Sequence, residues 1–197
     1  MAIDHQKLAV YYLLDMSGSM NDENRLSNSK EVGLMILNEL VEYDDDGMIH
    51  LVTFGGKVKE YGPVDIEKIE EFYRTARPDG GTPLAEAIEI IEDDILLRLN
   101  GAEAAHQLVV ITTDGLPNDQ NGVVRAISRI SKHVKSSEQL AFLFVQVGTD
   151  RRATEYLVWL DDNVKKHTNG LDLIDTIHFS KVSDMSIEQL IIKAFED

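Results

Sequence analysis

Two stretches of apolar residues limit the fold of this 197-residue chain more than any other feature. Residues 8–14 and 108–111 are apolar without alternation, which is typical of strands buried on both faces of a parallel sheet. Further strand-like segments cover 49–54, 57–61, 140–147 and 177–179. The alternating pattern of 57–61, directly after a pair of glycines, predicts an edge strand that pairs antiparallel.

Amphipathic segments with helical spacing separate these strands. They cover 33–40, 66–72, 84–91, 123–134, 157–164 and 187–195. Strands that alternate with helices predict an α/β fold with a doubly wound, mostly parallel six-stranded sheet, one antiparallel edge strand and helices on both faces. The hydrophobic content of 43% supports one large core, so we expect residues 1–197 to form a single domain.

A short polar motif follows the first apolar run. Asp15, Ser17 and Ser19 occupy alternate positions, and side chains at alternate positions of an extended segment point the same way. One carboxylate and two hydroxyls would then face a single point. Oxygen ligands of this kind suit a hard divalent cation, so the motif predicts a metal site in outline.

Two later loops carry residues that could complete this site. Thr82 follows Gly80 and Gly81, directly before a helical pattern, and Asp114 follows the second apolar run. Ligands of doubly wound sheets bind outside the carboxyl ends of strands where the winding reverses. If the strands that carry Asp15 and Asp114 are neighbours at that point, we expect the two carboxylates to converge.

Each of these residues also has an ordinary structural interpretation. Thr82 before Pro83 is a good helix N-cap, Asp114 can start a turn, and the two serines can bond to nearby backbone. All five residues occur together, each at a strand or helix boundary, and this favours a metal site over the separate structural interpretations. Asn118 and Asp119, in the loop after Asp114, remain open between a place around the metal and an ordinary loop position.

The order Asp15-x-Ser17-x-Ser19, then Thr82, then Asp114 resembles the metal-ion-dependent adhesion site of von Willebrand factor A-type (vWA) domains. The resemblance covers nearly the whole chain and implies a Rossmann-like fold. It also implies Mg²⁺, with Mn²⁺ or Ca²⁺ as other candidates, held by these five residues. In that family the serines ligate directly, and the aspartates act largely through water or hydrogen bonds. The resemblance further implies a binding module without catalysis.

The chemistry of such a site explains what it would bind. A Mg²⁺ ion with mainly neutral direct ligands stays electrophilic, and it normally keeps several exchangeable waters. One water can be replaced by the carboxylate of an Asp or Glu on a partner protein. In relatives, a shift of the loop at 80–82 is coupled to movement of the C-terminal helix. Crystal structures with and without a bound carboxylate would test that coupling here.

Other functions stay open at this point. A metal-dependent hydrolase or phosphotransferase is one, although phosphotransfer through Asp15 favours a second aspartate where this chain has Ser17, and Ser17 has no identifiable base. An accessory subunit of an ATPase or stress-resistance complex is another. Residues 144–148 and 160–162, with Asp175, resemble intracellular prokaryotic vWA members, including those of tellurium resistance clusters.

Charge and composition limit the possible partners of the protein and its possible locations in the cell. The chain has 35 acidic against 19 basic residues and a net charge of −16, which disfavours nucleic acid and anionic membranes as partners. The absence of cysteine excludes disulfides and thiolate metal sites. No apolar run approaches the roughly 18 residues of a membrane span, and the first residues do not resemble a signal peptide. We expect a cytoplasmic protein, and the sequence leaves the oligomeric state open.

Overall fold

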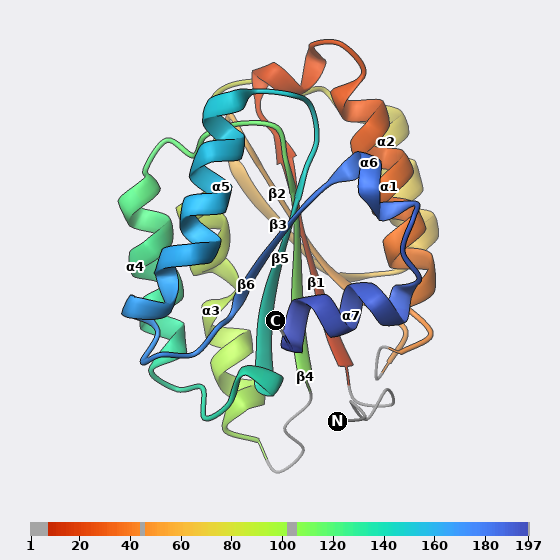
Figure 1. Ribbon diagram of the computed structural model, residues 1–197. Helices are drawn as coiled ribbons and strands as arrows, with labels where there is room; N and C mark the ends of the chain where they lie inside the picture. Colours follow the sequence, from red (N-terminus) through yellow and green to blue (C-terminus); the bar gives the residue numbers. More distant parts are fainter. Residues whose placement is uncertain (1–7, 44–45, 102–105, 197) are drawn as a thin grey trace.

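One six-stranded sheet runs through the computed structural model, which describes residues 8–43, 46–101 and 106–196. The strands are β1 (Leu8–Met16), β2 (Ile49–Gly55), β3 (Val58–Val64), β4 (His106–Thr113), β5 (Leu140–Gln146) and β6 (Ile174–His178). Their order is β3-β2-β1-β4-β5-β6, and all neighbours are parallel except the antiparallel pair β2 and β3. This confirms the predicted sheet and its antiparallel edge strand (Figure 1).

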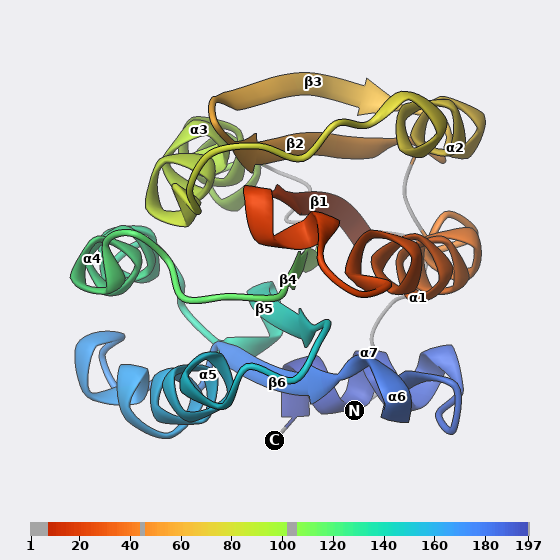
Figure 2. The same ribbon diagram turned by 90° about the horizontal axis from the view of Figure 1, so that it is seen from above.

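Helices cover both faces of the sheet. They are α1 (Arg25–Leu40), α2 (Ile66–Thr75), α3 (Leu84–Leu99), α4 (Gln120–Ser131), α5 (Arg151–Val164), α6 (Phe179–Val182) and α7 (Ile187–Glu196), with 3₁₀ turns η1 (Gly18–Asn21), η2 (Ser137–Gln139) and η3 (Lys165–His167). Seen from above, α3, α4 and α5 lie on one side and α1, α2, α6 and α7 on the other (Figure 2). In the described ranges, the helices are too short or too polar to cross a lipid bilayer.

Strand β1 supplies side chains to both halves of the core. Tyr12 and Leu14 pack in the layer of α1, α2 and α7, whereas Tyr11 and Leu13 pack in the layer of α3, α4 and α5. Successive side chains of a strand point to opposite faces, and both faces of β1 are covered. The uninterrupted apolar run is therefore the sequence signature of a central strand.

The end of the chain differs from the prediction. The sixth strand was expected at 177–179, but β6 spans Ile174–His178 and Phe179 already begins α6. The strand was hidden because two polar residues, Asp175 and Thr176, lie inside it. Asp175 is buried and forms an ion pair with Lys193 of α7. A polar pair within a short strand thus interrupts the apolar pattern on which the prediction depended.

The predicted neighbourhood of β1 and β4 is confirmed. The two strands are paired in parallel with Leu14 opposite Thr112, and the winding of the sheet reverses between them. The loops that follow β1, precede α3 and follow β4 come together above the middle of the sheet (Figure 2). Ligand sites of doubly wound sheets form at this position.

Candidate metal centre

Asp15 lies near the end of β1 and is fully buried. Its Oδ1 accepts a hydrogen bond from the backbone N–H of Ser17 at 2.8 Å, and its Oδ2 accepts one from the Thr113 hydroxyl at 2.6 Å. Burial raises the pKa of Asp15 to about 6, although both hydrogen bonds act in the opposite direction. The protein therefore orients this carboxylate firmly but leaves its negative charge poorly compensated.

Two serines connect this region to the second aspartate. The Ser17 and Ser19 hydroxyls are 3.1 Å apart, and the Ser19 hydroxyl donates to Asp114 Oδ1 at 3.0 Å. The prediction of convergence by an extended backbone was wrong for Ser19, because Ser19 lies in the 3₁₀ turn η1. The turn, and not strand alternation, brings its hydroxyl back over the strand end. We call Asp15, Ser17, Ser19 and Asp114 the acidic cluster.

Thr82 lies in an adjacent loop. Its N–H donates to Asn118 Oδ1 at 3.0 Å, and its carbonyl accepts from the Asn118 N–H at 3.0 Å. The same loop is tied to the acidic cluster because the Gly18 N–H donates to the Gly80 carbonyl at 3.0 Å. Within the described part of the chain, the Thr82 hydroxyl makes no hydrogen bond. The structure therefore places the Thr82 loop at the cluster without linking its hydroxyl to the other four residues.

A close approach of two glycines fixes the path of this loop. Gly80 has a φ of +69°, which disfavours side chains, and a Cβ there would collide with the backbone of Gly56. The Gly56 N–H donates to the Asp79 carbonyl at 2.8 Å across the same contact. Helix α3 begins at Leu84 with Pro83 as its N-cap and has no side-chain hydrogen bond at this cap, so the alternative interpretation of Thr82 as the N-cap was wrong.

Arg25, the first residue of α1, is a site residue that sequence reasoning missed. Its Nη1 lies 2.5 Å from Asp114 Oδ2, and its Nε is buried without a hydrogen-bond partner among the described residues. Arg25 compensates one of the two carboxylates of the acidic cluster. No spacing rule connects Arg25 with Asp114, 89 positions away, so only the fold reveals the pair.

The remaining loop residues divide into two roles. Asn118 holds the Thr82 loop, as described above, and so lies at the rim of the cluster. Asp119 caps α4, because its side chain accepts from the Gly122 N–H at 2.7 Å and pairs with Arg125 at 2.8 Å. Thr113, which orients Asp15, was also missed, although its position directly before Asp114 was a usable signal.

The chemistry of the donor set fits a small divalent cation. Among the residues that the structure describes, there is no group of three or more His, Cys, Asp or Glu side chains that could hold a metal. A centre here must therefore include the serine hydroxyls. Oxygens about 2.1 Å from an octahedral Mg²⁺ are about 3.0 Å from one another. The separations of 3.1 Å between the two serine hydroxyls and 3.0 Å between Ser19 and Asp114 match that spacing.

Comparisons with known proteins give the family. A family model described as von Willebrand factor type A domain matches residues 10–117. Sporozoite surface protein 2 of Plasmodium yoelii yoelii is 28% identical over 173 residues, which is 79% of this chain but only 20% of that protein. Thus the chain spans about a fifth of the length of this curated relative.

Solved structures show the same fold. The manganese-loaded TRAP protein of Plasmodium vivax is 16% identical with a TM-score of 0.67, covering 98% of this chain and 74% of that one. The SpRpn10 VWA domain is 17% identical with a TM-score of 0.66, covering 91% and 95%. The family match extends over more than half of the sequence, and its first and last residues lie in β1 and in the loop after β4. The chain therefore belongs to the von Willebrand factor type A domain family.

Proposed function

We propose that this chain is a divalent-metal-dependent protein-binding module without catalytic activity. In this proposal Asp15, Ser17, Ser19, Thr82 and Asp114 hold one Mg²⁺. The metal then binds an Asp or Glu carboxylate of a partner protein. Nucleic acid and membranes are not proposed as partners, because the chain carries a net charge of −16.

The continuous chain of hydrogen bonds from Asp15 through Ser17 and Ser19 to Asp114 carries this proposal. The four side chains come from β1, from Ser17 between β1 and η1, from η1 and from the loop after β4, and they lie at the carboxyl end of two adjacent strands. Two carboxylates against one guanidinium leave the cluster with a net negative charge, which attracts a cation. The manganese held by the TRAP protein of Plasmodium vivax supports a divalent metal in this fold.

A binding role agrees better with the surroundings of the serines than a catalytic one. A nucleophilic serine needs a base within hydrogen-bond reach. None of the histidines in the described ranges hydrogen-bonds to Ser17 or Ser19. The two hydroxyls contact each other, and the carboxylate that Ser19 reaches, Asp114, is held in an ion pair with Arg25. The proposal therefore assigns these hydroxyls to metal binding. The cytoplasmic location of the protein is a separate prediction from its sequence.

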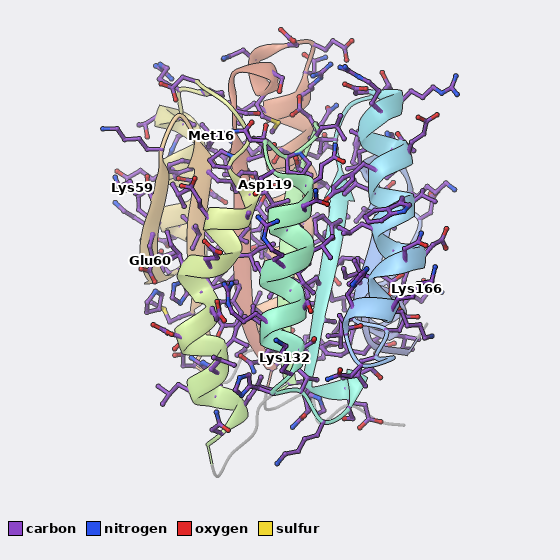
Figure 3. All side chains as sticks on the ribbon, turned by 90° about the vertical axis from the view of Figure 1, so that its left-hand side faces the viewer. Met16, Lys59, Glu60, Asp119, Lys132 and Lys166 are labelled. Carbon is purple, nitrogen blue, oxygen red and sulfur yellow. The ribbon has the colours of Figure 1, made fainter. Side chains whose placement is uncertain are left out.

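Titration with Mn²⁺, followed by electron paramagnetic resonance of the free ion, tests the metal. We expect one site per chain, and a loss of affinity of at least about a hundredfold in Asp15→Ala, because a cluster carboxylate is removed. Asp119→Ala is the matched control, since Asp119 lies at the upper end of α4 near the level of Met16 but outside the acidic cluster (Figure 3). Unchanged Mn²⁺ binding by Asp15→Ala would contradict the proposed site.

The open coordination position has its own test. Acetate added to the Mn²⁺-loaded protein should displace a metal-bound water and lower the water-proton relaxation rate, and Asp15→Ala should show no such protein-bound effect. Turnover of generic phosphoesters with Mg²⁺, abolished in Asp15→Ala, would instead favour a metal-dependent hydrolase.

A further inference from the structure

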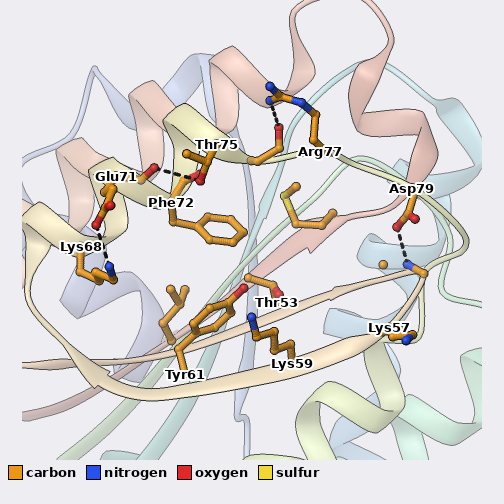
Figure 4. A pocket seen from close by; sticks show the side chains of 15 residues that line it. Thr53, Lys57, Lys59, Tyr61, Lys68, Glu71, Phe72, Thr75, Arg77 and Asp79 are labelled. Atoms are coloured by element: carbon orange, nitrogen blue, oxygen red, sulfur yellow. Dashed lines mark hydrogen bonds and ion pairs between the residues drawn. The ribbon is translucent and has the colours of Figure 1, made fainter.

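A groove between the edge strand β3 and helix α2 lies outside the acidic cluster. Its volume is about 570 Å³, within the range of ordinary ligand sites. Figure 4 shows Phe72 of α2 and Tyr61 of β3 pointing into it from opposite walls. The two rings are in edge contact with centroids 5.5 Å apart, so they form an apolar patch inside the groove.

The charges of this groove are opposite to those of the molecule. Four basic residues line it, Lys57, Lys59, Lys68 and Arg77, against two acidic ones, Glu71 and Asp79. The net charge of the lining is 4 − 2 = +2, whereas the whole chain carries −16. A positive groove on a strongly acidic protein indicates an anionic ligand.

Three of these cations have no carboxylate partner in the described part of the chain. Lys68 pairs with Glu71 at 2.7 Å. Arg77 donates only to the carbonyl of its neighbour Ala76, at 2.7 Å, and the Lys59 ammonium lies 4.4 Å from the centroid of the Tyr61 ring. Lys57 is exposed at the end of the groove near Asp79 (Figure 4).

The spacing of the cations indicates an extended ligand. Lys57, directly before β3, and Lys59 and Tyr61 within it occupy alternate positions and all line the groove, with Tyr61 at an irregularity in the pairing of β3 with β2. Alternate residues of a strand are about 6.7 Å apart, which is also the repeat of an extended peptide. Two carboxylates and one apolar side chain at alternate positions of a peptide would match these three positions. A compact anion such as phosphate would leave the Tyr61 and Phe72 rings beside these lysines uncovered.

We propose that the β3–α2 groove binds an extended acidic peptide segment of a partner protein, with two acidic side chains on Lys57 and Lys59 and an apolar side chain against Tyr61 and Phe72. Arg77 contributes a further cation from the opposite wall. This binding requires no metal, so the inference does not rest on the proposed function.

The probe is a seven-residue peptide with glutamates at its third and fifth positions and leucines at both ends, which fits either chain direction. Backbone amide resonances of the full chain are followed in EDTA. We expect shifts concentrated at residues 57–61 and 72–77, and at least a tenfold loss of affinity when both glutamates are replaced by glutamine. Shifts spread over the whole surface would overturn the proposal.

Matched variants distinguish peptide binding in the groove from a general effect of the net charge of the protein. Lys57→Glu with Lys59→Glu should lower affinity at least tenfold. Lys132→Glu with Lys135→Glu changes the net charge equally and should leave affinity within about twofold. Lys132 lies at the end of α4 opposite to Asp119 and away from Lys59 (Figure 3). Lys57→Gln with Lys59→Gln gives the same test with a smaller perturbation of the fold, which circular dichroism monitors. Equal losses in the near and far pairs would overturn the proposal.

Two further arms identify the ligand class. Inorganic phosphate or a deoxythymidine oligonucleotide that binds the groove more tightly than the peptide would overturn the peptide assignment. Asp15→Ala should bind the peptide as the unchanged protein does. Failure of peptide binding together with intact Mn²⁺ binding would reject the groove alone, and the reverse result would reject the metal proposal alone.

Discussion

Two polar clusters lie beside the same pair of central strands, β1 and β4, and differ in how their polar groups are satisfied. The hydroxyl cluster consists of Tyr12, Ser29, Tyr73 and Thr112, all buried and uncharged. Burial raises the pKa of both Tyr12 and Tyr73, so their phenols stay protonated. Every hydroxyl lies within 3.2 Å of another member of the cluster. This cluster closes on itself and needs nothing from outside.

The acidic cluster lies a few residues further along the strands. Unlike the hydroxyl cluster, it does not supply a partner for each of its own charges. Asp15 has hydrogen-bond donors but forms no ion pair with any described residue, and of the two cluster carboxylates Arg25 compensates only Asp114. A satisfied neutral network stabilises the fold, whereas an undercompensated charged one lowers stability until a counterion binds. On this basis the hydroxyl cluster has a structural role and the acidic cluster a binding role. Three variants test this distinction.

Gly33→Ala should break the hydroxyl cluster most strongly. A Cβ at this position of α1 would overlap the Tyr12 hydroxyl and crowd that of Tyr73. We expect a loss of about 2 kcal/mol in the free energy of unfolding from this overpacking, with Mn²⁺ affinity unchanged. Urea denaturation measures the loss. Gly101→Ala is the control, because a Cβ there meets nothing closer than 3.4 Å. Equal stability of the two variants would contradict the steric argument.

Tyr73→Phe should have a smaller effect. It removes a hydroxyl that lies 2.6 Å from the Tyr12 hydroxyl and 3.1 Å from that of Ser29. Buried polar groups left without a partner cost about 1–2 kcal/mol, so stability should fall by that amount while Mn²⁺ affinity stays the same. In Tyr61→Phe, the removed hydroxyl has no hydrogen bond in the described structure, and thermal denaturation should show little change. A lowered Mn²⁺ affinity in Tyr73→Phe would mean that the two clusters act as one.

Arg25→Gln should have the smallest effect of the three variants. It tests whether the acidic cluster lacks positive charge. It removes the positive charge beside Asp114, so a cation should bind more tightly, by roughly two- to tenfold at low salt. Calorimetric Mn²⁺ titration at two salt concentrations measures this. Arg125→Gln, which breaks the separate pair with Asp119, should leave the affinity unchanged. Weaker binding in Arg25→Gln would show instead that Arg25 is needed to orient Asp114.

The fold was accessible from the sequence because burial on two faces leaves a direct pattern. The apolar run of β1 and the helical stripes specify the order of elements, and the edge strand β3 is visible from its alternation. The pattern failed where polar residues are satisfied by tertiary contacts. Asp175 pairs with Lys193, so a buried strand position carries a charge that no local rule anticipates.

The site was accessible only in part. Asp15, Ser17 and Asp114 could be placed from strand ends, but Ser19 arrives through a 3₁₀ turn whose geometry the sequence did not suggest. Arg25 could not be found, because its contact with Asp114 depends on how α1 packs beside β4. The β3–α2 groove was missed for the same reason, since its walls come from two elements whose separation is a property of the folded molecule.

The strand order has a consequence for how the molecule opens locally. β1 is paired on both sides, whereas β3 and β6 are the two outer strands. Thermal fluctuations open outer strands first, because fewer contacts must be lost there. The acidic cluster therefore lies beside the strands that loosen last, and Lys57 and Lys59 lie at the start of β3, one of the strands that loosen first. Cation binding would persist when the outer strands open, whereas peptide binding in the β3–α2 groove would weaken.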